Sequence, residues 1–375
     1  MDPQPSFCPH LDCASRGEIN AGNLRCHDSL RNRWKCRTCG KTFSGRKGTP
    51  FYHLKSDPQL VVWVLTLLAY GCPPQAIVAT FGLDERTVAT WQQRAGQHCE
   101  AVQADRVQTP HAYTNVQADE IRVRCQRRQI VWVAMAVCAT TRLWLGAVVS
   151  PHRDKHLARS LAHKIYACVM QTVQHGVAQA ALLVVTDGWT AYRDAFVKTF
   201  RTAQRTGKRG RPRLLVWPHF VLGQTVKWQE AGRTLGIRVC HLAGNPAQIA
   251  RLLPSTQVLA TASIERLNAT FRQRLAGLCR RSRCLLRSAA SVQTNIYLVG
   301  TVYNFCTPHQ SLTTPQRELR TPAMAAGVSG HIWSVWELLA YQVAPPPYVA
   351  PKKRGRPPGK TAQSEIKGAS TLVTV

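Results

Sequence analysis

Acidic side chains are scarce in this chain, and one of them stands where an apolar run stops. The 375 residues include 49 Lys and Arg but only 19 Asp and Glu, which gives a formal net charge of +30 at pH 7. The apolar run from 181 to 186 predicts a buried strand, and Asp187 follows it directly. Gly188 then allows a sharp backbone turn. A carboxylate at the end of a buried strand is a candidate metal ligand.

Two further acids lie in segments with a regular pattern. Asp119 lies within residues 113–125, YTNVQADEIRVRC, which read as a strand. Glu265 lies near the start of residues 262–281, whose apolar side chains recur at helical spacing. Glu120 is expected to face the opposite side of its strand from Asp119. Each acid alone is explained equally well by an ion pair with an arginine. Three acids in strand, strand and helix make coincidence a weaker explanation.

Carboxylates that converge need a cation between them. They repel one another and raise one another's pKa, which divalent ions relieve. Mg²⁺ (or Mn²⁺) prefers oxygen ligands and keeps positions open for phosphate oxygens. Two such ions about 3.5–4 Å apart can activate an attacking oxygen and stabilise a leaving one. We therefore expect Asp119, Asp187 and Glu265 to converge on two ions in a nuclease-like site.

The elements between these acids predict an α/β fold. Strand, strand, strand, helix, strand, helix is the order that begins an RNase H-like mixed sheet flanked by helices. In that fold the first and fourth strands lie side by side, so Asp119 and Asp187 would project together from the sheet. The predicted elements are strands at 113–125, 129–141 and 143–150, a helix at 154–173, a strand at 181–189 and a helix at 191–200.

Two cysteine pairs near the N-terminus have the spacing of a zinc site. The thiolates of Cys8, Cys13, Cys36 and Cys39 would complete a tetrahedral site, which makes the zinc structural rather than catalytic. Trp34 and Phe43 are expected to pack over it. The alternative is four scattered buried thiols. The spare candidate ligands are His10, Cys26 and His27.

Residues 56–105 read as three helices. A short helix, a turn at Gly82 and a polar helix beginning after Asp84 resemble helix-turn-helix DNA readers. The alternative is an ordinary helical hairpin in a core. The polar helix offers Arg86, Thr87, Thr90 and Arg94 as candidate DNA contacts.

Basic segments extend the expected DNA contacts. Residues 352–360 contain Arg-Gly-Arg-Pro, which resembles an AT-hook that enters a narrow minor groove. Residues 208–213 repeat its core, and the alternative for both is a solvated linker or a localisation signal. The candidate contacts are Arg354 and Arg356 in the tail, Arg209 and Arg211 in the loop, and Arg266, Arg272 and Arg274 in the helix of Glu265.

Charge and hydropathy limit the partners. So large a positive charge favours a polyanion, and nucleic acid fits best. No basic amphipathic helix, signal peptide or membrane span is predicted, so we expect no membrane partner and reduced cysteines. The expected regions are a zinc ribbon (1–50), a helix-turn-helix domain (51–108), a catalytic domain (109–310) with a basic loop at about 203–214, a helical extension (311–343) and a disordered basic tail (344–375).

Together these motifs resemble the DDE transposases of bacterial insertion sequences, specifically the insertion sequence one family. The resemblance covers roughly residues 8–310 and rests on the cysteine pairs, the helix-turn-helix, ADEI, TDGWTAY and SIERLNATFRQRLAGLCRRS. The last motif is the most specific. The stretch between Asp187 and Glu265 is longer than this family leads us to expect, and its surplus includes the basic loop.

The resemblance implies a function. Asp119, Asp187 and Glu265 would be the catalytic triad, with Mg²⁺, in an enzyme that cuts transposon ends and joins them to target DNA. It implies double-stranded DNA as partner, a homo-oligomer on DNA, and a cytoplasmic, nucleoid-associated location if the source is prokaryotic. Two alternatives stay open: a catalytically silent DNA-binding regulator derived from a transposase, and a stand-alone structure-specific nuclease.

Overall fold

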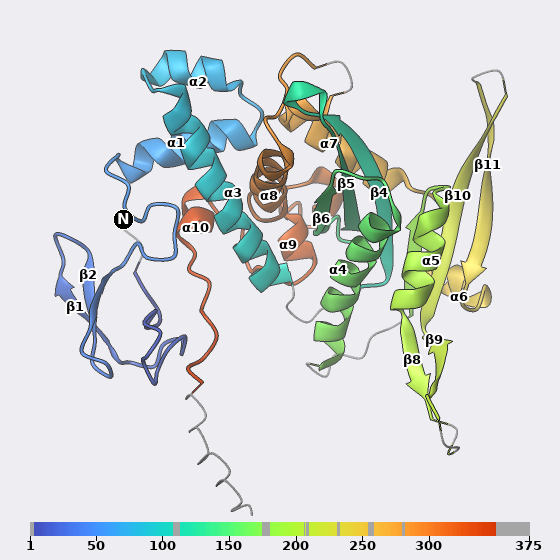
Figure 1. The fold of residues 1–375 in the computed structure, drawn as a ribbon, viewed down its shortest axis with the longest axis horizontal. Helices are drawn as coiled ribbons and strands as arrows, with labels where there is room; N and C mark the ends of the chain where they lie inside the picture. Colours follow the sequence, from blue (N-terminus) through green and yellow to red (C-terminus); the bar gives the residue numbers. More distant parts are fainter. Residues whose placement is uncertain are drawn as a thin grey trace, which may run out of the picture.

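A six-stranded mixed sheet lies at the centre of the fold (Figure 1). The computed structural model of the protein describes residues 4–107, 113–174, 181–205, 207, 210–230, 233–253, 259–279 and 282–349. The strands stand in the spatial order β11-β10-β7-β4-β5-β6. In chain order they are β4 (Asn115–Arg124), β5 (Ile130–Cys138), β6 (Trp144–Ser150), β7 (Leu182–Thr186), β10 (Phe220–Glu230) and β11 (Arg233–Ala243).

β4 joins the two halves of this sheet. β4, β5 and β6 form an antiparallel meander, while β7 runs parallel to β4 on one side and to β10 on the other. Every residue of β7 is buried, as expected for a parallel strand covered on both faces. The predicted first and fourth strands therefore lie side by side, which confirms the expected pairing of the strands that lead to Asp119 and Asp187.

β7 ends at Thr186, so it is shorter than the strand predicted over 181–189 and shorter than the strands on either side of it. Its last pairs join Thr186 to Ala118 in β4 and to Gln224 in β10. β4 then runs on to Arg124, and β10 runs on to Glu230. We call the place between them, beyond Thr186, the strand-end notch. Asp187 is the first residue in it.

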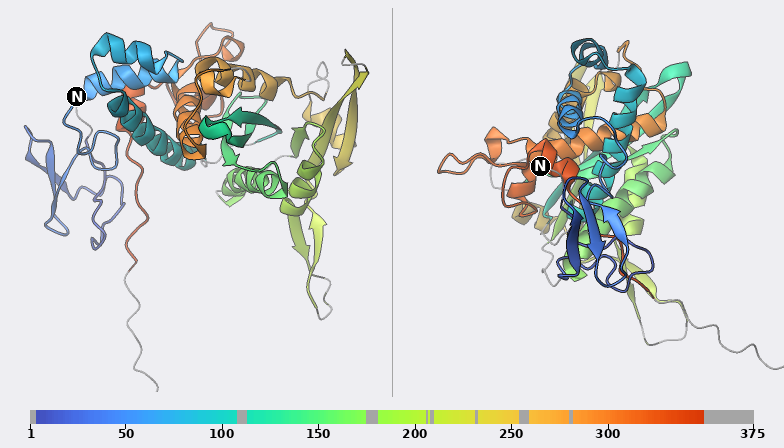
Figure 2. Two further views of the ribbon diagram at one scale, coloured as in Figure 1. Left: turned by 45° about the horizontal axis from the view of Figure 1, so that its top comes forward. Right: turned by 90° about the vertical axis from the view of Figure 1, so that its left-hand side faces the viewer.

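Helices cover both faces of the sheet (Figure 2). α4 (Lys155–Gln174) and α5 (Thr190–Thr199) lie on one face, and α7 (Ala262–Arg274) and α8 (Ala289–Cys306) lie on the other. The alternation of side chains along β4 divides its residues between the faces. Gln117 and Asp119 make hydrogen bonds to α7, whereas Glu120 faces α5.

α7 is shorter than the helix predicted over residues 262–281. It ends at Arg274, because Leu275 has an extended conformation with φ −126° and ψ 92°. A tight 3₁₀ turn, η2 (Ala276–Leu278), follows and packs against β4. The apolar stripe nevertheless stays buried to its end, since Leu275 and Leu278 both lie in the core. Residues 280 and 281, the last of the predicted helix, lie outside the described residues.

The three helices predicted in residues 56–105 are confirmed as α1 (Pro58–Ala69), α2 (Pro74–Phe81) and α3 (Glu85–Val107). Asp57 caps α1, and Asp84 accepts hydrogen bonds from the first backbone N–H groups of α3. Gly82 ends α2 in the left-handed conformation. α3 then packs along α8, so the helical region shares one hydrophobic core with the sheet.

The remaining elements lie around this core. A small antiparallel sheet near the N-terminus has its own apolar cluster, and α10 packs against α1, α3 and α8. No helix among the described residues has the length and apolar character needed to cross a membrane. These elements are β1 (Leu24–Asp28), β2 (Arg33–Cys36), β3 (Thr42–Ser44), η1 (Gln126–Arg128), β8 (Arg201–Gln204), β9 (Arg213–Val216), α6 (Ala247–Leu252), η3 (Gln310–Leu312), α9 (Pro322–Ala325) and α10 (Val335–Ala340).

Candidate metal centres

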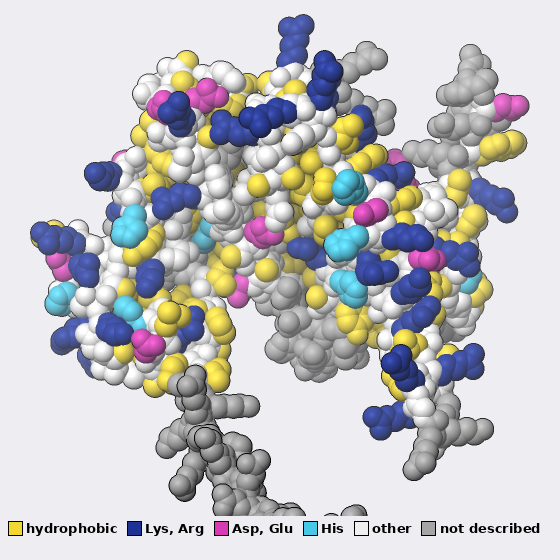
Figure 3. Space-filling model, in the orientation of Figure 1, with side chains coloured by type: hydrophobic (Ala, Val, Ile, Leu, Met, Phe, Trp, Pro, Cys, Tyr) yellow, Lys and Arg dark blue, Asp and Glu magenta, His cyan; other side chains and the backbone are white. Residues whose placement is uncertain are grey.

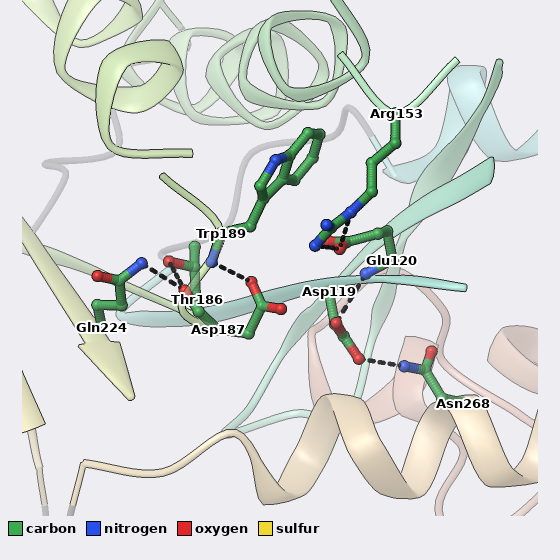
Figure 4. Close-up of polar contacts among 8 residues, drawn as sticks. All are labelled: Asp119, Glu120, Arg153, Thr186, Asp187, Trp189, Gln224 and Asn268. Carbon is green, nitrogen blue, oxygen red and sulfur yellow. Dashed lines mark hydrogen bonds and ion pairs between the residues drawn. The ribbon is translucent and has the colours of Figure 1, made fainter. Parts of the chain in front are cut away.

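Three carboxylates converge at the strand-end notch (Figure 4). Asp119, Glu120 and Asp187 each offer one oxygen atom, and these three atoms lie within 4.8 Å of one another. Asp119 and Glu120 come from β4 just past its last pair with β7, and Asp187 follows β7. Oxygen ligands so close together match the chemistry that Mg²⁺ or Mn²⁺ requires. The three residues could therefore hold a metal ion.

Glu120 is the member of this group that the sequence did not predict. It faces the opposite side of β4 from Asp119, as expected, yet its carboxylate still reaches the other two. The reason is that β7 ends at Thr186, beside Ala118, so β7 does not extend between Asp187 and the side of β4 that Glu120 faces. The sequence signal for Glu120 was only its place beside Asp119 on one predicted strand, since the length of β7 relative to β4 is not visible in the sequence.

Arg153 holds Glu120 in place. The Arg153 Nε donates to Glu120 Oε1 over 2.8 Å, and the Arg153 guanidinium also bonds the same oxygen through Nη2. Its guanidinium lies 5.2 Å from the ring centroid of Trp132 and 4.7 Å from that of Trp189. The Glu120 side chain is only 4% exposed. The buried carboxylate of Glu120 is thus paired with a guanidinium group that two aromatic rings hold in position.

Glu265 lines the same cavity but lies outside the group of three. The cavity, of about 340 Å³, is formed at the notch by Asp119, Asp187 and Glu265 together with Gly188, Thr225, Val226 and Thr261. Glu265 occupies the first turn of α7, where Thr261 Oγ1 donates to its carboxylate over 3.3 Å. The structure therefore brings all three predicted acids to one cavity, with Glu265 on its wall.

Hydrogen bonds fix α7 against β4. The side-chain oxygen of Gln117 accepts from the backbone N–H groups of Ser263 and Ile264 over 2.8 and 3.0 Å. Gln117 thus caps the first turn of α7 from a neighbouring strand. One turn further on, buried Asn268 donates to Asp119 Oδ2 over 2.7 Å. These contacts set the position of Glu265 relative to Asp119.

The carboxylates of the notch are held in an unfavourable electrostatic environment. Burial, followed by the charges of Asp187 and Glu120, raises the pKa of Asp119 to about 7. Burial also raises the pKa of Asp187 and of Glu120. The rise in the pKa of Asp187 is partly offset, because its Oδ1 accepts a hydrogen bond from the Trp189 backbone N–H over 3.1 Å. Such shifts favour a bound cation, which removes the repulsion.

The four predicted cysteines form the second centre. Cys8, Cys13, Cys36 and Cys39 place their sulfur atoms within 4.8 Å of one another. The Cys8–Cys39 and Cys13–Cys36 sulfur pairs are each 3.8 Å apart. Sulfurs bound to one zinc at 2.3 Å in a tetrahedron lie about 3.8 Å apart, so the spacing fits zinc. Phe43 is buried against the cluster and Trp34 packs on it, as predicted.

Among the cysteines of this centre, Cys36 has an environment that favours the thiolate form. Burial raises the pKa of Cys8 and Cys13. Burial opposes ionisation of Cys36 as well, but hydrogen bonds from the backbone of Cys39 and Thr38 and from the Cys8 and Cys13 side chains outweigh it and lower its pKa to about 7. Zinc binds the thiolate form. The spare candidates stay apart: His10 packs against Phe43, while Cys26 and His27 are exposed.

The residues predicted to contact DNA from α3 and α7 differ in their exposure and in whether they make hydrogen bonds within the fold. Arg86, Thr90 and Arg266 are exposed, and Thr87 and Arg272 are half-buried. Arg94 is engaged in the fold, since its Nη2 donates to the Tyr52 carbonyl over 3.1 Å. Arg274 is likewise engaged: it donates to Thr307 Oγ1 over 3.2 Å and lies 4.6 Å from the Tyr70 ring centroid.

The basic segments are only partly described. Arg211 is exposed between β8 and β9. Arg209, Arg354 and Arg356 lie outside the described residues, as does the segment predicted to be an AT-hook.

Comparison with known proteins adds no family assignment. A scan against protein-family models finds no match, and a search of curated proteins finds none either. The mixed sheet, the cysteine cluster and the converging acids are compatible with the resemblance to DDE transposases. That resemblance rests on the sequence motifs and on this geometry.

Proposed function

We propose that this protein is a DNA transposase that binds terminal inverted repeats and catalyses metal-dependent strand cleavage and strand transfer. The observation that carries this proposal is the meeting of Asp119, Asp187 and Glu265 at one cavity. In a chain of charge +30, acids grouped at a strand end are suited to bind cations against a phosphate. The strand order supports an RNase H-like assignment for the sheet.

Each acidic residue has a distinct part in the proposed site. Asp119, Glu120 and Asp187 would hold a first ion, and Glu265 with Asp119 would complete the site for a second. When bound, Mg²⁺ or Mn²⁺ supplies Lewis acidity to the scissile phosphate and lowers the pKa of an attacking hydroxyl or water. Asn268 orients Asp119 by donating to one of its oxygens. Thr261 orients Glu265 in the same way.

The regions before the sheet would bind and position DNA. We propose that the cysteine cluster holds a structural zinc in a ribbon, since all four ligands come from the protein. The α2–α3 pair would act as a helix-turn-helix, with exposed Arg86 and Thr90 reaching the duplex. Homo-oligomers on DNA and a nucleoid-associated location in a prokaryote belong to the same proposal.

The decisive experiment measures DNA chemistry with a matched pair of variants. Purified protein is incubated with Mg²⁺ and duplexes that carry the ends of the element from which the gene comes. We expect cleavage at the ends and transfer of pre-cut 3′-hydroxyl ends to a second DNA. Asp187→Ala should abolish both reactions. Asp194→Ala should leave them intact, because Asp194 is an exposed residue of α5 that pairs with Lys198.

The result separates the three functions. Binding without any cleavage in the wild type would favour the silent regulator. Cleavage by hydrolysis, with no transfer of pre-cut ends, would favour a nuclease. Cleavage that survives Asp187→Ala would show that the acidic cavity is not the active site.

A further inference from the structure

The hairpin of β4 and β5 carries a row of arginines beyond the strand-end notch. Arg122 and Arg124 are exposed on β4, whereas Ile121 and Val123 are buried, so the two arginines share one face. The turn that follows adds exposed Arg127 and Arg128. We call these four arginines the basic arm. None of them belongs to the DNA contacts discussed above.

The turn of the basic arm holds an uncommon backbone conformation. Arg127 and Arg128 have φ values of 53° and 56°, in the left-handed region that side chains other than glycine disfavour. Backbone hydrogen bonds enforce the turn: Gln126 N–H donates to Leu286 O over 2.9 Å, and Cys125 N–H donates to Gln129 O over 2.8 Å. Strain that the surrounding structure maintains is typical of functional sites.

The charge of the basic arm is not neutralised within the described part of the chain. No ion pair there joins any of the four arginines to a carboxylate. In Figure 3, Lys and Arg side chains gather at the top of the view, where Figure 1 shows the turn between β4 and β5. Such a group of cations favours an external polyanion.

The face of the hairpin also offers flat and apolar side chains. Across the strand pair, Arg122 lies opposite half-buried Trp132, and Arg124 lies opposite Ile130, which is 38% exposed. Arg153, which holds Glu120, stacks on the same Trp132. Arginines beside an aromatic ring fit a sugar–phosphate backbone and its bases. By the alternation of β4, Arg122 and Arg124 share the face of Glu120, so the row leads to that member of the acidic group.

The turn of the basic arm lies beside the N-terminal half of α3. Gln126 lines a cavity of about 360 Å³ together with Glu85, Ala89 and Gln92 of α3 and with Arg287. From Asp119 to Arg124 the strand spans roughly 17 Å at about 3.3 Å per residue. One DNA strand rises about 3.4 Å per nucleotide, so the distance from the acidic site to Arg124 matches the rise of roughly five nucleotides.

We propose that the basic arm binds the DNA backbone between the duplex held by α3 and the scissile phosphate at the acidic cavity. This inference rests on the proposed DNA function and adds the path that the DNA takes. The contacts are to phosphates, so they contribute affinity and position rather than sequence preference.

The test compares salt dependence of binding among charge-matched variants. Affinity for a fluorescent mixed-sequence duplex is measured by anisotropy over a range of NaCl concentrations, without divalent metal. Arg122→Gln/Arg124→Gln and Arg127→Gln/Arg128→Gln each remove two charges from the arm. The control, Arg159→Gln/Arg317→Gln, removes two exposed charges elsewhere, and Arg317 also has a positive φ of 62°.

Each double variant of the arm should bind more weakly than the control. The slope of log K against log salt should become less negative by about 1.8, because each phosphate contact contributes about 0.9. Circular dichroism checks folding. If the turn variant unfolds, the strand variant decides, since Arg122 and Arg124 have ordinary strand positions.

Two failures are distinguishable. If the wild type does not bind DNA at all, the result contradicts both the proposed function and the inference about the basic arm. If the wild type binds, but both arm variants match the control, only the inference about the arm is overturned. A loss that appears with anionic lipid vesicles and not with DNA would assign the arm to a membrane surface, and would also overturn the inference.

Discussion

The two candidate metal centres of this protein are built in opposite ways. The cysteine cluster takes its ligands from a short stretch of chain, with Cys8 and Cys39 only 31 positions apart. The acidic site spans the fold, since Asp119 and the Asn268 that orients it are 149 positions apart. The cysteines are largely buried, whereas the acids border a cavity.

Under the proposed function, this difference separates a structural centre from a reactive one. Four thiolates fill the coordination sphere of zinc and leave no place for a substrate. Carboxylates on the wall of an open cavity leave positions for water and phosphate oxygens. A centre that holds the chain together can be local and closed. A centre that receives a substrate, as we propose for the acidic site, needs a strand that ends beside an open cavity, and β7 ends beside one.

The largest effect is expected from removing a cysteine ligand. Structural zinc contributes about 10–16 kcal/mol of apparent binding free energy in small zinc domains. Cys36→Ser should therefore reduce the zinc content per chain to near zero and make the N-terminal region sensitive to protease, while Mg²⁺ binding at the acidic site persists. Elemental analysis and limited proteolysis measure this. Cys26→Ser is the control, because Cys26 is exposed on β1 outside the cluster.

A zinc content that survives Cys36→Ser would contradict the closed cysteine site. A simultaneous loss of Mg²⁺ binding would show that the two centres depend on one another.

The next effect should follow loss of a central acidic ligand. Asp187→Asn should weaken Mg²⁺ binding by at least about 100-fold, since it removes a charged oxygen ligand from the group of three. Glu265→Gln should weaken it less, because Glu265 lies outside that group. The measurement is a Mg²⁺ titration of tryptophan fluorescence. Trp189 serves as the reporter, because its backbone N–H donates a hydrogen bond to Asp187 Oδ1. Equal losses in both variants would contradict this ranking.

A smaller effect is expected at the cation that holds Glu120. Arg153→Gln leaves a buried carboxylate without its charged partner. The metal-free protein should lose about 2 kcal/mol of unfolding free energy, less than the ~3–5 kcal/mol of a fully buried pair, because the Arg153 side chain is 37% exposed. Mg²⁺ should restore part of this loss, since it offers another cation to Glu120. Urea denaturation with and without Mg²⁺ measures both effects, with Arg193→Gln on the surface of α5 as control. An unchanged free energy of unfolding in Arg153→Gln would show that the Arg153–Glu120 pair does not stabilise the fold.

The smallest effect is a dependence on pH. The pKa of Asp119 rises from 3.8 to about 7 on folding, so the fold binds its proton more tightly than the unfolded chain does. Its contribution to stability is fully present below the unfolded pKa and is lost as pH rises through about 7. Metal-free protein should therefore become less stable over that range, and Mg²⁺ binding should strengthen over it.

Asp119→Asn tests this sign. It should flatten the fall in stability between pH 6 and pH 7, which amounts to about 1 kcal/mol over that interval. Denaturation curves of the two proteins at several pH values provide the measurement. An identical pH profile in both proteins would show that Asp119 does not carry the shift.

The secondary structure was largely predictable because it depends on local patterns. Apolar runs and alternation identified β4 to β7, and Asp84 identified the start of α3. The end of α7 was predicted wrongly, since Leu275 leaves the helix to suit contacts with β4 that no local pattern encodes. For the same reason, the sequence did not predict the two hairpins that follow Asp187, β8–β9 and β10–β11.

The candidate site was predictable in its acids but not in its surroundings. Asp119, Asp187 and Glu265 stood out because acids are scarce in this chain. Glu120 was missed, because its place depends on how far β7 extends beside β4. Arg94 and Arg274 were assigned to DNA, yet their guanidinium groups bond within the fold, where pairing is decided by distant segments.

The sequence by itself determined the residue types, their order, the local elements and the closed cysteine spacing, because these follow from neighbours along the chain. Only the tertiary structure decided that β7 stops short between two longer strands. That mismatch in strand length opens the notch, brings Glu120 beside Asp187, and leaves the basic arm uncovered. Strand register is set by packing across the whole sheet, so no local pattern could reveal it.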